Sequence, residues 1–194
     1  MSQILLNNLH EAKSILDQFI SNTQALESVH QAGIAMVNAI QNGGKIISCG
    51  NGGSMCDAMH FAEELSGKFR EDRRALPALS ISDASHMSCV GNDYGYNEVF
   101  ARYLEALGQP NDVLLAISTS GNSTNVIRAM EVAKSKGIKI VALTGKDGGK
   151  MAALADIEVR APYSKFADRA QEIHIKVIHA LIQTIEHELQ LTKV

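Results

Sequence analysis

The stretch Val113-Leu-Leu-Ala-Ile-Ser-Thr-Ser-Gly-Asn-Ser-Thr-Asn125 decides the fold of this chain. It opens with five apolar residues without alternation, which is typical of a strand covered on both faces in a parallel sheet. Hydroxyl, amide and glycine residues follow, as in a loop, and a helical pattern then runs over Thr124–Lys136. We interpret the stretch as one strand–loop–helix unit of an α/β sheet.

The same pattern recurs along most of the chain. Apolar runs of strand length occupy Lys45–Cys49, Leu76–Ser82, Val113–Ser118, Ile138–Thr144 and Ile157–Ala161. Helical stretches occupy Ser54–Ser66, Glu98–Leu107, Thr124–Lys136 and Arg169–Leu191. Strands that alternate with helices predict a Rossmann-like, three-layer αβα sandwich with a five-stranded parallel sheet. Ligands of such sheets bind at the carboxyl ends of the strands.

Two amphipathic helices are expected ahead of the sheet, over Leu5–Phe19 and Leu26–Ile40, and the second ends at Asn42-Gly-Gly44. Periodicity does not decide whether this pair, residues 1–43, packs on the sheet or forms an oligomer surface. We find no internal repeat and no linker. We therefore expect a single domain over residues 1–194.

Composition and charge exclude several classes of protein. The 194 residues are 45% hydrophobic and 20% charged, with a net charge of −3, so no basic surface is available for nucleic acid. The three cysteines are an odd number with apolar or small neighbours, which suits reduced thiols, and they form no C-x-x-C pair of a thiolate zinc site. We find no signal peptide and no apolar run long enough to span a bilayer. We therefore expect a cytoplasmic protein without a membrane partner.

The loop Gly50-Asn-Gly-Gly-Ser54 joins the first predicted strand to a helix. Its glycines would let backbone N–H groups approach an anion at a helix N-terminus. A dinucleotide fingerprint fits poorly, because Met55 takes the third glycine position and the next acid at a strand end, Asp83, is too distant. No Gly-Lys-Ser/Thr of a Walker loop follows. The loop is therefore either an anion site or a tight turn without a ligand.

The second polar loop carries the stronger signal. A helix cap needs one hydroxyl, but four are available here, from Ser118, Thr119, Ser120 and Ser123. Together with the free N–H groups of a helix start, they can surround a phosphate without lysine. Such a neutral site favours a monophosphate over a triphosphate. We predict that the loop binds the phosphate of a sugar phosphate.

Three further side chains are candidates for acid–base chemistry. His60 and Glu64 are four residues apart and therefore lie on one helical face, as either a functional or a surface pair. His179 lies between Ile175 and Ile182 on a largely apolar face, where a histidine is either a core residue or a catalytic group. Spacing alone does not decide between these alternatives.

Several separate motifs resemble the sugar isomerase (SIS) family of phosphosugar-binding domains. They are Cys49-Gly-Asn-Gly-Gly-Ser54, Asp57-Ala-Met-His-Phe-Ala-Glu-Glu-Leu65, Cys89-Val-Gly-Asn-Asp93, Ser118–Asn125, Leu143-Thr-Gly-Lys-Asp-Gly-Gly149 and Gln171-Glu-Ile-His-Ile-Lys-Val-Ile-His179. The resemblance covers essentially the whole chain. It implies an aldose–ketose isomerase that converts sedoheptulose 7-phosphate into D-glycero-D-manno-heptose 7-phosphate, the first step towards the heptose of lipopolysaccharide.

The resemblance also implies roles for individual residues. Glu64 would be the base and His179 the acid of an enediol mechanism, with Zn²⁺ at His60, Glu64, Gln171 and His179 and no nucleotide cofactor. The implied substrate-binding residues are Asn51, Gly52, Gly53, Ser54, Glu64, Asn92, Asp93, Ser118, Thr119, Ser120, Ser123 and Gln171. Gly91-Asn-Asp93 also has the composition of a turn. Gln171 and His179 are about 12 Å apart along a continuous helix. To bind one ion, their side chains must either lean towards each other or come from two different subunits.

Relatives in the SIS family leave two alternatives open. One is a non-catalytic adaptor that binds the replication initiator DnaA, although an adaptor has no need of His60, Glu64 and His179 together. The other is an isomerase of a different sugar phosphate, which pocket length would decide. The resemblance further implies a homo-oligomer, expected to be a tetramer with sites at the subunit interfaces.

Overall fold

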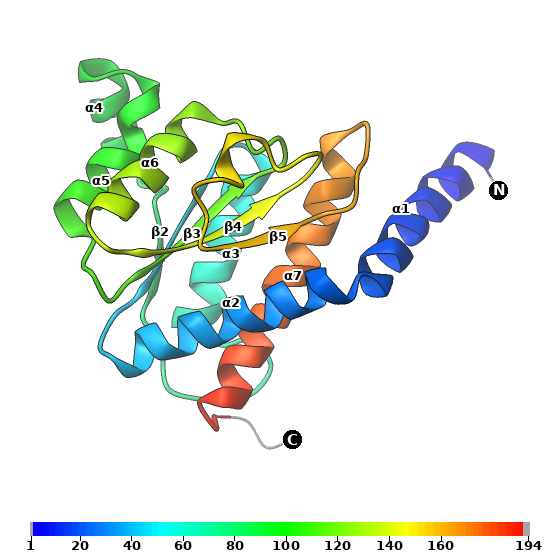
Figure 1. Cartoon of the computed structure of the whole chain (residues 1–194), viewed down its shortest axis with the longest axis horizontal. Coiled ribbons are helices and arrows are strands. Elements are labelled where there is room, and N and C mark those ends of the chain that lie inside the picture. The colour runs from blue at the N-terminus through cyan, green and yellow to red at the C-terminus, as the bar shows by residue number, and fades with distance from the viewer. Residues whose placement is uncertain (1, 192–194) are drawn as a thin grey trace.

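Figure 1 shows the computed structural model of the chain, which describes residues 2–191. Five parallel strands form one sheet in the order β2-β1-β3-β4-β5. The strands are β1 (Ile46–Gly50), β2 (Ala78–Ser80), β3 (Val113–Ser118), β4 (Lys139–Thr144) and β5 (Ile157–Arg160). The five-stranded parallel sheet expected from the apolar runs is thereby confirmed.

Helices cover both faces of the sheet, which gives three layers (Figure 1). They are α1 (Gln3–Ser21), α2 (Thr23–Gln41), α3 (Gly53–Ser66), α4 (Ala84–Asp93), α5 (Val99–Leu107), α6 (Thr124–Ser135) and α7 (Ala167–Glu188). Two short 3₁₀ helices, η1 (Tyr96–Glu98) and η2 (Gly149–Met151), lie between them.

Alternate residues of the strands supply two separate cores. On β3, Leu115 and Ile117 pack in one apolar cluster with α2, α3 and α7, whereas Leu114 and Ala116 pack in the other with α5 and α6. Side chains point to opposite faces every second residue, so a strand buried on both sides must be apolar throughout. This is the physical reason for the unbroken run Val113–Ile117.

The strand order places the ends of β1 and β3 side by side. Gly50 pairs with Ile117, so the loops that follow the two strands are neighbours. The helices that follow them diverge, because Phe61 of α3 packs on one face of the sheet and Met130 of α6 on the other. This is the topological switch point, where open α/β sheets bind their ligands.

Two elements differ from the sequence prediction. Helix α4 was not predicted, because its residues have little apolar periodicity and Val90 is its one buried side chain. Its start is fixed by a cap instead, since the Asp83 side chain accepts from the His86 N–H at 2.7 Å. Strand β2 has three residues rather than the seven of Leu76–Ser82, and it lies at the sheet edge directly after Pro77.

The two leading helices behave differently. Helix α2 packs along α7, and Gly33 permits the close approach, since a Cβ there would lie 2.7 Å from Thr184 Cγ2. Helix α1 extends away from the sheet (Figure 1) and buries Ile15 and Phe19. Within residues 2–191, no helix has both the length and the apolar character that crossing a membrane requires.

His174 joins α7 to the end of β4. Its Nε2 lies 2.8 Å from the Thr144 carbonyl oxygen, which accepts the ring N–H, and the side chain is fully buried. Its Nδ1 has no partner among the described residues. Burial lowers the pKa of His174 to about 4, against the opposing effect of the hydrogen bond. The neutral ring is therefore the form that fits this site.

We predict that this histidine makes the fold sensitive to acid. The unfolded chain binds the proton near pH 6.5 and the folded chain only near pH 4, so acid favours unfolding between these values. The loss of unfolding free energy is about 3 kcal/mol. His174→Gln keeps an N–H donor and does not titrate, so its loss over this range should be smaller. Urea unfolding at a series of pH values measures both slopes, and equal slopes would contradict the prediction.

The raised pKa of Asp57 has the opposite effect on stability. The folded chain holds the Asp57 proton up to about pH 6, above the ordinary range of the unfolded carboxyl, so for this group acid favours the folded state. That contribution is present in wild type and variant alike. It therefore cancels when the two pH slopes are compared.

Candidate active site

Helices α3 and α7 run side by side in the same direction. Each follows a strand of the parallel sheet, so each begins at the carboxyl edge and packs back over the same face. Near their starts, the Gln171 side chain of α7 lies directly against Gly53 of α3, where any Cβ would collide with the amide. Further along, His60 of α3 meets His179 of α7. Residues of α3 therefore contact residues of α7 at successive positions along the two helices, and we call each such position a level.

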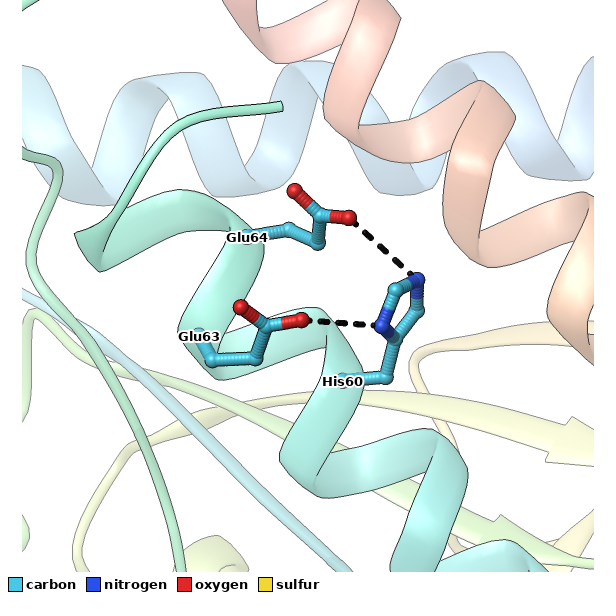
Figure 2. Close-up of side chains that lie close together, drawn as sticks. All are labelled: His60, Glu63 and Glu64. Atoms are coloured by element: carbon cyan, nitrogen blue, oxygen red, sulfur yellow. Dashed lines mark ion pairs between the residues drawn. The ribbon is translucent and has the colours of Figure 1, made fainter. Parts of the chain in front are cut away.

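The second of these levels gathers three of the predicted site residues. His60 Nε2 lies 3.0 Å from His179 Nε2 and 3.6 Å from Glu64 Oε1. On the other side of the same ring, His60 Nδ1 lies 3.0 Å from Glu63 Oε1, and Figure 2 shows the imidazole facing both carboxylates. The Phe69 ring lies beside His179, with 5.6 Å between ring centroids. Helical spacing and packing thus bring two imidazoles and a carboxylate to one point.

The electrostatics of His179 favour its neutral form. Burial lowers its pKa, and the neighbouring charge of His60 lowers it further, against an opposing effect of Glu64. A contact between two Nε2 atoms also holds one proton, since one nitrogen must donate and the other accept. The accepting nitrogen directs its lone pair at this proton, and the Glu64 carboxylate oxygen lies 3.6 Å from His60 Nε2.

This set of donors suits a cation. Two imidazole nitrogens with a glutamate oxygen form the three-ligand set typical of catalytic zinc sites. His60, Glu63 and Glu64 also place one ligand atom each within 4.8 Å of one another. The fourth predicted ligand, Gln171, lies at the other level, where its amide packs against Gly53.

Two carboxylates near His60, those of Glu63 and Asp57, are absent from the predicted site. Glu63 is exposed on α3, and its i, i+3 spacing from His60 is the signal in the sequence that points to it. Asp57 lies three residues before His60 and is buried, and its Oδ2 has no partner among the described residues. Burial raises the pKa of Asp57 to about 6, although the charge of His60 opposes this. Three carboxylates of the motif, rather than Glu64 alone, therefore lie near His60.

The loop after β3, residues 118–123 (the serine loop), brings several hydroxyl groups close together. Ser118 Oγ lies 2.9 Å from Ser123 Oγ and 3.4 Å from Ser120 Oγ, so these hydroxyls face one another. Ser123 is the N-cap residue of α6, yet its side chain makes no capping hydrogen bond. Capping therefore does not account for these hydroxyls, while the first turn of α6 offers its N–H groups at the same place. Thr119 is half-buried beside them.

The glycine-rich turn after β4, residues 145–149, and the residues that follow it pack against the serine loop. The Lys150 N–H donates to Asn122 Oδ1 at 3.1 Å, and the Met151 N–H donates to the Gly121 carbonyl at 3.0 Å. Gly121 has φ +64° and packs against the Gly148 carbonyl so closely that a Cβ would overlap it. The turn thus determines the path of the serine loop.

The loop after β1 is tied to the loop after β3. Asn51 and Asn125 exchange two side-chain hydrogen bonds of 2.8 Å, and Tyr96 Oη donates to Asn51 Oδ1 at 3.3 Å. Gly52 adopts φ +56° as the N-cap of α3, a conformation that favours glycine. Ser54 is buried in the first turn of that helix. The predicted residues Asn51 to Ser54 therefore adjoin the serine loop at the switch point.

Asn92 and Asp93 lie at the end of α4, on neither of the two helices that carry His60, Glu64 and His179. The turn that their sequence suggested is wrong, because they are the last two residues of α4. Both are exposed, and Asn92 Nδ2 donates to Asp93 Oδ1 at 2.7 Å. Among residues 2–191, no hydrogen bond or ion pair joins Asn92 or Asp93 to His60, Glu64 or His179. Their assignment as substrate-binding residues stays a prediction.

Comparison with known proteins shows the family to which the chain belongs. The model of the SIS domain family matches residues 8–145, which is more than half of the chain. The chain therefore belongs to the SIS domain family.

Three relatives that match nearly the whole chain are named phosphoheptose isomerase. The one from Histophilus somni is 61% identical over 181 residues, which cover 93% of each chain. The solved phosphoheptose isomerase from Neisseria gonorrhoeae is 39% identical and covers 95% of this chain and 98% of its own, with a TM-score of 0.89. That from Francisella tularensis is 36% identical and covers 96% and 100%, with a TM-score of 0.87.

We predict that Gly121→Ala disturbs the serine loop far more than an equivalent change elsewhere. Gly137→Ala is a matched control, because Gly137 has φ +70° and nothing within 4 Å of a Cβ. Both variants carry the strain of a positive φ, but Gly121→Ala adds the overlap with Gly148. It should lose about 1–3 kcal/mol more unfolding free energy than the control. Urea denaturation measures the difference, and equal losses would show that the turn does not constrain the loop.

Proposed function

We propose that this protein is an aldose–ketose isomerase that converts sedoheptulose 7-phosphate into D-glycero-D-manno-heptose 7-phosphate. This is the first step in making the heptose precursor of lipopolysaccharide. The observation that carries the proposal is the meeting of His60, Glu64 and His179 on two helices that start at the strand-end loops. An adaptor protein has no need of this cluster. The names of the relatives from H. somni, N. gonorrhoeae and F. tularensis support the same activity.

The chemistry requires a proton to move between two neighbouring carbons, and further protons to move between their oxygens. Glu64 is the proposed base, because its carboxylate lies within the cluster and its side chain is 16% exposed, enough to meet a substrate. His179 is the proposed acid. Its neutral ring has one N–H to donate and one nitrogen to accept, so it can exchange protons with the substrate oxygens through the enediol.

The loops at the switch point supply the other half of the site. Ser118, Thr119, Ser120 and Ser123 are the proposed ligands of the phosphate, with the N–H groups at the start of α6. Seven residues of helix, about 10 Å, separate Gly53 from His60. An extended sugar chain that begins at the serine loop therefore points its carbonyl end towards Glu64. Asn51, Gly52, Gly53, Ser54 and Gln171 are the proposed contacts along its length, with Asn92 and Asp93 from α4.

Zn²⁺ is the proposed cofactor, held by His60, Glu64 and His179 with Gln171 as a fourth ligand. When bound, the ion would polarise the substrate oxygens as a Lewis acid. Gln171 is the least direct of the four, because its amide packs at the level of Gly53.

A homotetramer with shared sites is the proposed assembly. Helix α1 leaves Ile4, Leu9 and Ile20 more than half exposed, and such an apolar face is suited to contact with another subunit. Sedimentation of the purified chain tests this, and a monomer at micromolar concentration would contradict it. The cytoplasmic location expected from the sequence stays a prediction.

We expect Glu64→Gln to abolish most of the turnover of sedoheptulose 7-phosphate. The amide keeps the shape of the side chain but cannot accept the carbon-bound proton, so kcat should fall by about 10²–10⁴-fold. The Tm should change little, because Glu64 is not part of the apolar core. Turnover is followed by the appearance of the aldose phosphate. Glu105→Gln, on α5 beneath the opposite face, is the control and should keep full activity.

An unimpaired Glu64→Gln enzyme would remove Glu64 from the mechanism. An inactive wild type would overturn the proposed function itself. Metal analysis of the same preparations, made without a chelator, tests the zinc proposal. Zinc in the wild type and its loss in His60→Ala are the expected results, and equal zinc in both would contradict the site.

A further inference from the structure

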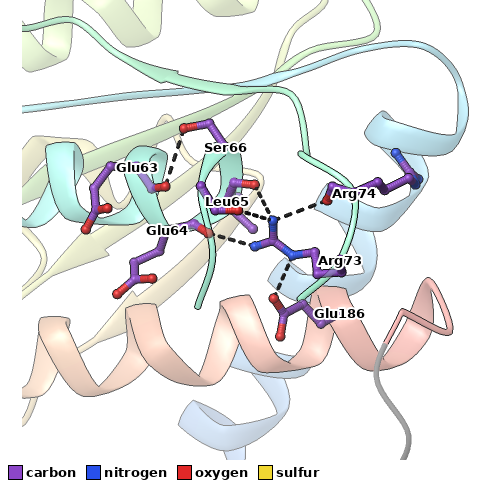
Figure 3. Close-up of polar contacts among 8 residues, drawn as sticks. Glu63, Glu64, Leu65, Ser66, Arg73, Arg74 and Glu186 are labelled. Carbon is purple, nitrogen blue, oxygen red and sulfur yellow. Dashed lines mark hydrogen bonds and ion pairs between the residues drawn. The ribbon is translucent and has the colours of Figure 1, made fainter. Parts of the chain in front are cut away.

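One buried arginine holds the end of α3. Arg73 lies in the segment between α3 and β2, and Figure 3 shows its guanidinium between the last turn of α3 and α7. Its Nη2 donates to the Glu64 carbonyl at 2.6 Å, and its Nη1 donates to the carbonyls of Leu65 and Gly67 at 2.8 Å each. Its Nε donates to Glu186 Oε1 on α7, also at 2.8 Å. One side chain therefore bonds to both helices of the candidate site.

Both charges of this pair are removed from water. The side chains of Arg73 and Glu186 are 1% and 2% exposed, and among residues 2–191 no other ion pair has both partners so deeply buried. The carbonyls in the last turn of a helix lack helical partners, and a cation there also opposes the negative end of the helix dipole. The rigid fork of a guanidinium matches this set of acceptors, which a lysine ammonium does not.

The position of the pair relates it to the candidate catalytic groups. Arg73 bonds to the backbone of Glu64 itself, the residue whose carboxylate faces His60. Glu186 follows His179 by seven residues, or two turns, so both lie on one face of α7. The contact between Arg73 and Glu186 is therefore a further level of the α3–α7 interface, beyond the level of the two histidines.

Apolar packing alone does not fix this register. Phe61 and Leu65 of α3 share a core with Ile178 and Ile182 of α7, but burial of apolar surface has no direction and tolerates small sliding movements. The Arg73 hydrogen bonds are directional and join specific atoms of the two helices.

We propose that Arg73, through Glu186, is a positioning residue that sets the register of α3 against α7 and so holds Glu64 and His60 opposite His179. The measurement of kcat that tests this proposal rests on the proposed isomerase function. The measurement of the distance between His60 and His179 does not. Arg73 acts through the backbone of α3 and does not itself reach the reacting atoms.

The test replaces both charges together. Arg73→Met with Glu186→Met leaves no unpaired buried charge, so the double variant should stay folded, as buried ion pairs often tolerate apolar replacement. A small misplacement of catalytic groups is costly, so its kcat for sedoheptulose 7-phosphate should fall at least about tenfold. Its KM should stay within about twofold, because the serine loop that binds the phosphate is untouched. In its crystal structure, the 3.0 Å contact between His60 Nε2 and His179 Nε2 should be lost.

Lys45→Met is the matched control. Lys45 pairs with buried Asp112 at 2.7 Å at the amino ends of β1 and β3, far along the sheet from the loops. It should lower the Tm and leave kcat unchanged, which separates lost stability from lost register.

A double variant that keeps the wild-type kcat and the 3.0 Å contact would overturn the proposal. A kcat that merely follows Tm across all variants, Lys45→Met included, would also overturn it. If the wild type does not isomerise sedoheptulose 7-phosphate, the proposed function fails instead. The crystallographic separation of the two histidines then decides on the role of Arg73 by itself.

Discussion

The register between α3 and α7 is the constraint on which the candidate site depends. Both helices return over one face of a parallel sheet, so they run in the same direction and meet at successive levels. Gln171 meets Gly53, His179 meets His60, and Glu186 meets Arg73 at the end of α3. A shift of one residue along either helix would move a side chain by 1.5 Å and turn it by about 100°. The two imidazoles would then no longer face each other.

The sheet imposes the second constraint, because its strand order brings the ends of β1 and β3 together while α3 and α6 diverge. Anion binding at this point requires no basic side chain, since helix N-termini and hydroxyls supply the donors. The chain thereby combines a neutral loop, the proposed phosphate site, with a cluster of titratable groups about two helical turns away. Tight glycine contacts, such as that of Gly121 with Gly148, keep the loop in place.

Much of the fold follows from the sequence, because a strand buried on both faces has to be apolar throughout. Helix α4 could not be found in this way, since the Asp83 cap rather than an apolar stripe fixes its start. Spacing placed His60 and Glu64 on one face, but only tertiary packing brings His179 to them. Arg73 gave no signal at all, because it lies in an irregular segment and its partners are mostly backbone carbonyls. Local patterns thus predict elements, and contacts distant in sequence require the structure.

The central claim is that Glu64 and His179 move protons between the substrate and this site. The most direct test is NMR of sedoheptulose 7-phosphate incubated with the wild-type protein in D₂O. Proton transfer through an enediol, by a partly exposed carboxylate, predicts an aldose heptose phosphate that carries solvent deuterium at C2. Absence of the aldose, or an aldose formed without any deuterium, would contradict the account.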